Sequence, residues 1–220
     1  SLSYIGDSAV VVEFEQTIDP VVNARAMAVG EAIRRTGHRG VRDVVEGFCS
    51  VTVVFEPLET DLSNLISAIE QEAATQRGSI ADGREVILPV CYGGRFGPDL
   101  AAVASFGSCS EQEVVRTHSA SMYRVYMLGF MPGFAYMASV DSRIALPRRV
   151  EPRVRVPAGS VGIAGMQTGL YPVEAPGGWQ LIGRCPIKVF EIENPDPCLL
   201  RAGDSVRFQV ITEEKYRQLV

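Results

Sequence analysis

Hydrophobic and polar positions along the first half of the chain change period several times. Residues 9–14, Ala-Val-Val-Val-Glu-Phe, form a β-branched run that predicts a strand. Apolar residues then recur at helical spacing over residues 22–33. Asp19 can cap this helix, Pro20 can occupy its first turn and Gly37 can end it. We therefore expect a strand followed by an amphipathic helix.

Two further strands, a second helix and a fourth strand follow along the chain. Residues 41–46 and 50–55 are expected to form a hairpin, because both runs are rich in β-branched residues. Apolar residues follow Asp61 at helical spacing over residues 62–69, and residues 85–90 return to a strand pattern after a polar turn over residues 76–83. The order β-α-β-β-α-β is that of a split βαβ, or ferredoxin-like, domain, which we place at residues 1–88.

The second half consists mainly of short apolar runs between Gly and Pro clusters. Two helices come first, one over residues 99–104 and one starting at Ser110, where Ser-Glu-Gln-Glu113 matches a capping box. Five runs then read as strands: Tyr123–Leu128, Ser160–Ala164, Trp179–Ile182, Ile187–Glu191 and Ser205–Ile211. Thr212 can cap a last helix through Leu219. This spacing predicts a small β-barrel over residues 89–220, so the fold class is α+β.

Composition narrows the classes of protein and of site. Hydrophobic residues make up 46% of the 220 residues and no apolar run reaches 18, so we expect no membrane span. A net charge of -5 gives no electrostatic reason to bind nucleic acid. The first seven residues lack the features of a secretory signal, which favours a cytoplasmic protein. Five cysteines without a C-x-x-C pair, and two histidines, indicate neither a metal site nor a disulfide framework.

One segment, residues 156–186, holds seven of the 21 glycines and the single tryptophan. Polar and aromatic residues are interleaved with these glycines: Gln167, Thr168, Tyr171, Trp179 and Arg184. Two interpretations stay open. The glycines turn the corners of the barrel while Trp179 fills its core; or the five residues line a small-molecule pocket, where apolar walls bury a ligand and a few polar groups orient it.

Longer motifs indicate a family. The chain resembles the bacterial 5-oxoprolinase B subunit, a family also named allophanate hydrolase subunit 1 and KipI, over residues 125–137, 147–149, 152–165, 167–172 and 176–184. These motifs are long and ordered, and the resemblance spans essentially the whole chain. The chain departs from the family at Cys185, where Thr is more usual, and at three methionines that replace commoner aliphatic or aromatic residues: Met127, Met131 and Met137.

The resemblance implies a fold, an activity and partners. The fold is an α/β N-terminal domain followed by a cyclophilin-like β-barrel. The activity is that of a non-autonomous subunit of an ATP-dependent amide hydrolase, which opens 5-oxoproline to glutamate. The partners are the homologous C subunit, similar to allophanate hydrolase subunit 2 and KipA, and the A subunit. Because the chain has no G-x-x-x-x-G-K-[ST] loop, we expect the assembled complex to bind ATP and assign no ATP site to this chain.

Three other activities stay open. A KipI-like protein would bind a sensor histidine kinase and would need no catalytic side chain. Allophanate is the alternative substrate, although a Ser-Ser-Lys amidase signature is not evident. Peptidyl-prolyl isomerisation rests on analogy with the cyclophilin-like fold alone.

Arginine and histidine supply the candidate site chemistry. Arg153 and Arg155, on the Gly-rich face with Gly159, are expected to hold a carboxylate or a phosphorylated intermediate, because guanidinium pairs such groups bidentately. The alternative is a solvated loop. We take Arg155 as a catalytic candidate together with His118, whose imidazole suits a general base near neutral pH. The alternative for His118 is a structural histidine, and we assign His38 no function.

The loop over residues 129–134, Gly-Phe-Met-Pro-Gly-Phe, is unusually apolar for a solvent-exposed loop. Phe130, Met131 and Phe134 are therefore expected either to cap the barrel or to contact the homologous partner, because aromatic residues and Met are favoured in interfaces.

Overall fold

The computed structural model describes residues 1–76, 78 and 83–220. The chain divides into two compact units, Ser1–Ala81 and Asp82–Val220, which we call the N-terminal unit and the barrel unit. Helices and strands occur in both, so the predicted α+β class is confirmed. Among the described residues, no helix combines the length and the apolar character needed to cross a bilayer.

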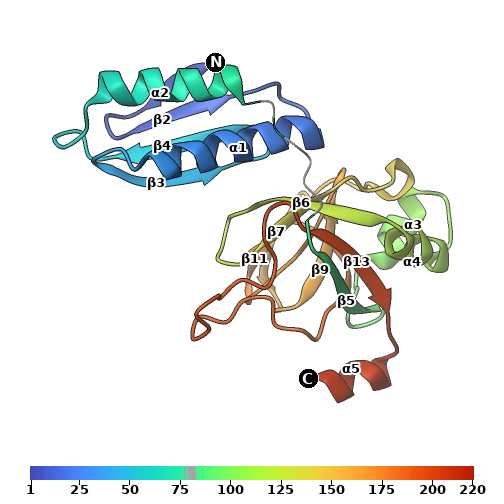
Figure 1. Cartoon of the computed structure of the whole chain (residues 1–220). Coiled ribbons are helices and arrows are strands. Elements are labelled where there is room, and N and C mark those ends of the chain that lie inside the picture. The colour runs from blue at the N-terminus through green and yellow to red at the C-terminus, as the bar shows by residue number, and fades with distance from the viewer. Residues whose placement is uncertain (77, 79–82) are drawn as a thin grey trace. The chain divides into compact units, whose positions relative to one another are not determined.

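The N-terminal unit is a four-stranded antiparallel sheet with two helices on one of its faces (Figure 1). Its strand order is β1-β2-β4-β3. The elements are β1 (Leu2–Ile5), β2 (Ala9–Glu13), α1 (Pro20–Thr36), β3 (Val41–Glu46), β4 (Ser50–Phe55) and α2 (Leu62–Thr75). Strand β4 alternates buried and half-buried residues, and its buried side chains pack against the apolar stripes of the helices.

Local capping explains where the two helices begin and end. The Asp19 carboxylate accepts hydrogen bonds from the amides of Val21 and Val22 at 2.7 and 3.1 Å, and Gly37 ends α1 in the left-handed conformation with φ of 59°. Asp61 accepts from the Asn64 amide at 3.0 Å. These contacts confirm the predicted starts of both helices and the predicted end of α1. The polar turn expected over residues 76–83 falls largely outside the described residues.

The barrel unit contains a closed seven-stranded barrel of order β10-β7-β6-β13-β5-β12-β9 and a separate two-stranded sheet, β11-β8. Its strands are β5 (Glu85–Tyr92), β6 (Met122–Leu128), β7 (Ala135–Ala138), β8 (Arg153–Val156), β9 (Ser160–Ala164), β10 (Gln167–Leu170), β11 (Ala175–Gly177), β12 (Gln180–Arg184) and β13 (Ser205–Val210). Its helices are α3 (Leu100–Phe106), α4 (Glu111–Ala120), the 3-10 turn Ser142–Ile144 and α5 (Glu213–Leu219). Helices α3 and α4 lie together beside the barrel (Figure 1).

Strand β5 belongs to the barrel, not to the N-terminal sheet. It pairs in parallel with β13 from Glu85↔Ser205 to Val90↔Val210, and antiparallel with β12. The N-terminal sheet takes β1 as its remaining strand instead. The sequence pattern locates β5 correctly but assigned it to the first half, because periodicity predicts a strand without specifying its partner.

The strand expected over residues 187–191 is absent from the described structure. Only an isolated bridge joins Phe190 to Cys198, supported by hydrogen bonds from the Leu199 amide to the Val189 carbonyl and from the Glu191 amide to the Pro197 carbonyl. That prediction is therefore wrong. Pro186 precedes this run, and Pro195 and Pro197 lie in the segment that returns beside it; these prolines lack the amide hydrogen that a longer ladder would need.

Candidate functional site

Four aromatic side chains meet on one side of the barrel unit: Phe134, Tyr136, Tyr171 and Trp179. We call them the aromatic cluster. The Phe134 ring makes edge-to-face contacts with the other three, with centroid distances of 4.7 to Tyr136, 5.1 to Tyr171 and 5.3 Å to Trp179. The structure thus brings together Trp179 and Tyr171, both predicted to bind substrate, although Trp179 is only 4% exposed. Phe134, Tyr171 and Trp179 are almost fully buried, and Tyr136 is the half-buried member, so it is the edge of the cluster that polar groups and a ligand could reach.

Arg153 is fixed beside this cluster by a residue that sequence reasoning did not select as a site residue. The Asp99 carboxylate accepts from Arg153 at 2.7 Å and from the Leu181 amide at 2.6 Å, and Leu181 packs in the same core as Trp179. Asp99 was expected only to start a helix. It does precede α3, but its side chain makes no capping bond there. No local sequence signal distinguishes these two uses of an aspartate.

The aromatic cluster includes none of the other predicted substrate-binding residues. The Arg155 side chain is 75% exposed and forms a bidentate pair with Glu174 at 2.9 and 3.0 Å. Trp179 precedes the first residue of β12, whereas Arg184 is the last residue of this strand. The Arg184 guanidinium lies 5.8 Å from the centre of the Phe96 ring. Gln167 is half-buried at the start of β10.

Gly159 has a structural reason to be glycine. Its φ is 78°, and a Cβ there would lie 2.3 Å from the Cys185 carbonyl oxygen. Its amide donates to the Tyr171 carbonyl at 2.7 Å, and its carbonyl accepts from the Cys185 amide at 2.8 Å. Close backbone packing therefore accounts for this residue without a ligand.

His118 and Thr168 are fully buried in the barrel interior and bonded to each other. Thr168 Oγ1 donates to the Gly162 carbonyl at 3.0 Å, so it accepts from His118 Nε2 at 2.9 Å. The other ring nitrogen, Nδ1, then accepts from the Tyr92 hydroxyl at 2.8 Å. Both nitrogens of the neutral imidazole are occupied.

Burial lowers the pKa of His118 from 6.5 to about 3. The ring is therefore neutral at physiological pH, with its acceptor lone pair engaged by Tyr92. This geometry favours the structural alternative for His118, and the general-base role stays a prediction.

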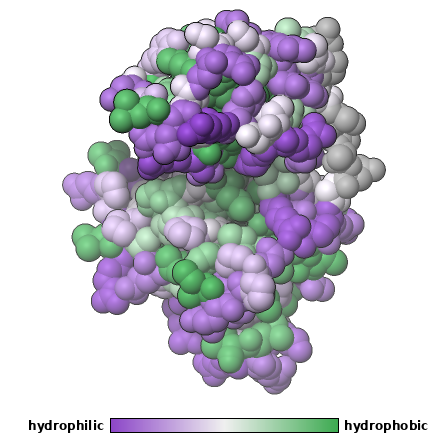
Figure 2. All heavy atoms as spheres, turned by 60° about the vertical axis from the view of Figure 1, so that its left-hand side comes forward, coloured by the Kyte–Doolittle hydropathy of each residue, from purple (hydrophilic) through white to green (hydrophobic). Residues whose placement is uncertain are grey.

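The apolar loop before β7 presents its three predicted partner-binding residues differently. Phe134 is 1% exposed and belongs to the aromatic cluster, so it caps the barrel core. Met131 is half-buried against the same cluster. Phe130 is 66% exposed and has a φ of 69°. Figure 2 shows hydrophobic side chains scattered among hydrophilic ones on the face that it draws, and Phe130 is among the exposed apolar residues of the barrel unit.

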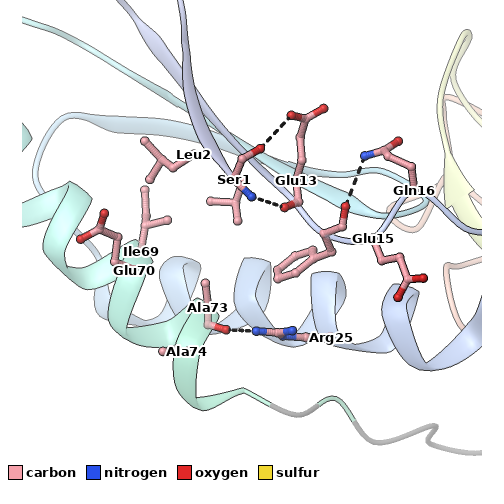
Figure 3. A pocket seen from close by; sticks show the side chains of 12 residues that line it. Ser1, Leu2, Glu13, Glu15, Gln16, Arg25, Ile69, Glu70, Ala73 and Ala74 are labelled. Atoms are coloured by element: carbon pink, nitrogen blue, oxygen red, sulfur yellow. Dashed lines mark hydrogen bonds between the residues drawn. The ribbon is translucent and has the colours of Figure 1, made fainter.

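Two cavities of similar volume lie away from the aromatic cluster, each within one unit. A groove of about 610 Å³ in the N-terminal unit is lined by the end of β2, the first residues of the chain and α2 (Figure 3). There, Arg25 lies 4.8 Å from the centre of the Phe14 ring and donates to the Ala73 carbonyl, which joins α1 to α2. A cavity of about 590 Å³ in the barrel unit is lined by residues that include Tyr92 and Val115. The described linings contain none of the predicted site residues.

Comparison of the sequence with known proteins shows which family this chain belongs to. The family described as carboxyltransferase domain, subdomain C and D, matches residues 1–200. The 5-oxoprolinase B subunit of Bacillus subtilis (strain 168) is 41% identical over 226 residues, which cover 98% of this chain and 94% of that protein. This chain belongs to the 5-oxoprolinase B-subunit family.

Solved structures agree with the fold of this B-subunit family member. TTHA0988 superposes with a TM-score of 0.82 at 35% identity, over 92% of this chain and 40% of that one. The Kluyveromyces lactis urea amidolyase superposes with a TM-score of 0.83 over 99% of this chain and 15% of that one. At 21% identity the second likeness shows a shared fold alone.

The buried imidazole predicts a pH-dependent stability. The unfolded chain binds a proton at His118 near pH 6.5 but the folded chain only near pH 3, so this contribution to the free energy of unfolding is complete above pH 6.5 and is lost as the pH falls toward 3. The slope from this one group is at most about 1.4 kcal/mol per pH unit. Urea unfolding between pH 7 and 4.5, followed by Trp179 fluorescence, measures this pH dependence of the free energy of unfolding.

His118→Gln should flatten the slope, with His38→Gln as the matched control. An unchanged slope in His118→Gln would contradict the burial argument.

Proposed function

We propose that this chain is the B subunit of an ATP-dependent 5-oxoprolinase, which converts 5-oxoproline, ATP and water to glutamate, ADP and phosphate. The observation that carries the proposal is the 41% identity with a 5-oxoprolinase B subunit over nearly the full length of both chains. The chain acts only together with the homologous C subunit and with the A subunit. We retain the cytoplasmic location predicted from the sequence.

The chemistry explains why such an enzyme needs ATP and several chains. The lactam of 5-oxoproline is an unactivated amide and a poor electrophile, and phosphorylation of its carbonyl oxygen creates a leaving group for attack by water. We assign ATP to the assembled complex and no nucleotide site to this chain. The chain's own contribution is to bind and orient the substrate beside the aromatic cluster. Roles in substrate binding for Gly159, Gln167, Thr168 and Arg184 stay predictions.

Reconstitution tests the activity. The purified chain, mixed with the A and C subunits, should hydrolyse ATP in a 5-oxoproline-dependent manner, and omission of any one of the three proteins should abolish the coupling. Phosphate release and glutamate formation are measured together, with allophanate in place of 5-oxoproline as the substrate control. ATP hydrolysis that depends on allophanate but not on 5-oxoproline would contradict the proposal. So would full 5-oxoproline-dependent ATP hydrolysis in the absence of this chain.

Arg155 is the catalytic candidate that remains accessible. Its ion pair with Glu174 is exposed and contributes roughly 0–1 kcal/mol, so its removal should leave the fold intact. We expect Arg155→Ala to abolish turnover of the assembled enzyme while the complex still forms, as judged by size-exclusion chromatography. Arg207→Ala is the matched control because it removes another exposed strand arginine, paired with Glu85. Normal turnover in Arg155→Ala would end this role.

Phe130 is the side chain proposed to contact the C subunit. An exposed phenylalanine in a loop anchored by buried Phe134 resembles the aromatic anchors that dominate protein interfaces. The C subunit should slow hydrogen exchange over residues 129–134, and Phe130→Ser should weaken its binding by roughly tenfold or more. Ile192→Ser, which alters another apolar residue, 74% exposed, is the control. Unchanged exchange and affinity would place the interface elsewhere.

A further inference from the structure

A short loop carries two arginines to the edge of the aromatic cluster. Arg148 and Arg149 follow Pro147, and two hydrogen bonds hold this loop on either side of Trp179. The Arg149 amide donates to the Gly178 carbonyl at 2.8 Å, and Gln180 Nε2 donates to the Pro147 carbonyl at 2.8 Å. The backbone beneath the two arginine side chains is therefore fixed to the segment that carries the tryptophan.

Asp99 fixes the side chains of this group as well. Besides Arg153, its carboxylate accepts from Arg149 at 3.4 Å, so one oxygen faces two guanidinium groups. The other oxygen accepts from the Leu181 amide, and the Asp99 amide donates back to the Leu181 carbonyl at 2.9 Å. The Asp99 side chain is only 7% exposed. A carboxylate held in this way orients the arginines that it binds, because charge-assisted hydrogen bonds are strong and directional.

The positive charge of this arginine group (Arg148, Arg149 and Arg153) exceeds what Asp99 can neutralise. The group carries three guanidinium charges against one carboxylate, and the hydrogen bond from Arg149 to Glu151 uses the backbone carbonyl of Glu151. Arg148 is exposed and lies 5.9 Å from the centre of the Trp179 ring. Its charge also opposes the rise in pKa that burial causes at Tyr136 and Tyr171. An excess of cationic donors thus borders the outer edge of the aromatic cluster.

We propose that the arginine group, with Asp99 as its positioning residue, binds the carboxylate of the substrate while the lactam ring rests beside the aromatic cluster. The inference rests on the proposed function for the identity of the substrate. Guanidinium groups match a carboxylate in shape and charge, and Arg149 and Arg148 are exposed enough to reach one. Asp99 keeps Arg149 and Arg153 from collapsing onto other acceptors and so keeps the site formed before the substrate arrives.

Trp179 provides a direct probe, because it is the only tryptophan of the chain and Arg148 lies over its ring. The isolated full-length chain is titrated with 5-oxoproline, with 2-pyrrolidinone, which lacks the carboxylate, and with inorganic phosphate. We expect a saturable change in tryptophan emission with 5-oxoproline at millimolar concentrations and none with 2-pyrrolidinone. The carboxylate assignment would be overturned if 5-oxoproline caused no saturable change in tryptophan emission. It would also be overturned if inorganic phosphate caused such a change and 5-oxoproline did not.

Kinetics of the assembled enzyme test the positioning role. Asp99→Asn keeps the side-chain size but removes the charge that orients the arginines, and we expect KM for 5-oxoproline to rise by roughly tenfold or more with a much smaller change in kcat. Arg148→Ala, which alters an exposed loop residue, should raise KM without affecting folding. The matched control is Asp204→Asn. The Asp204 side chain is 6% exposed, pairs with Arg84 and accepts from the Arg201 amide, so it is a buried aspartate with an arginine and an amide partner that lies outside the aromatic cluster.

The outcomes separate this inference from the proposed function. If the wild-type assembly shows no turnover of 5-oxoproline, the proposed function fails, and the fluorescence titration still tests the carboxylate site. If the wild type turns over 5-oxoproline and both Asp99→Asn and Arg148→Ala keep the wild-type KM, the inference alone fails. An equal rise of KM in Asp204→Asn would also overturn it, because the effect would then follow from general loss of stability.

Discussion

A single buried carboxylate holds two distant segments of the barrel unit, residues 149–153 and Leu181, against its own segment. Asp99 bonds to Arg149 and Arg153, 50 and 54 residues away, and to Leu181, 82 residues away. A charge with so little exposure to water is stable only while its partners stay in place, because breaking a buried pair costs about 3–5 kcal/mol. The positions of the arginine loop, of β8 and of the Trp179 segment are therefore coupled through one side chain.

The polar groups of the barrel unit fall into two classes with different consequences. In the interior, Tyr92, His118, Thr168 and the Gly162 carbonyl form a chain of hydrogen bonds in which each ring nitrogen and the threonine hydroxyl are satisfied. Such a chain stabilises one packing arrangement. At the edge of the aromatic cluster, the cations outnumber the carboxylate that holds them. Binding chemistry is expected where charge is left over, and structural chemistry where it is not.

The sequence predicted local features well and long-range ones poorly. Helix ends follow from caps such as Asp19, Ser110 and Thr212, whose partners lie within a few residues. The capping box at Ser110 is confirmed in full, with the Glu113 amide and carboxylate both engaged. The pairing of β5 with β13 joins residues 120 positions apart, and nothing in either strand's alternation specifies it. The partners of Asp99 are likewise long-range. Its sequence context indicates a helix start, and only the folded chain brings Leu181 and the arginines to it.

The most direct test is a crystal structure of the assembled enzyme, with all three of its proteins, 5-oxoproline and a non-hydrolysable ATP analogue. We predict that the substrate carboxylate lies within about 3 Å of the guanidinium nitrogens of Arg149 or Arg148, that the lactam ring lies beside Trp179, and that Asp99 is still bonded to Arg153. A substrate bound entirely by the partner proteins, with no atom of this chain in contact, would contradict it.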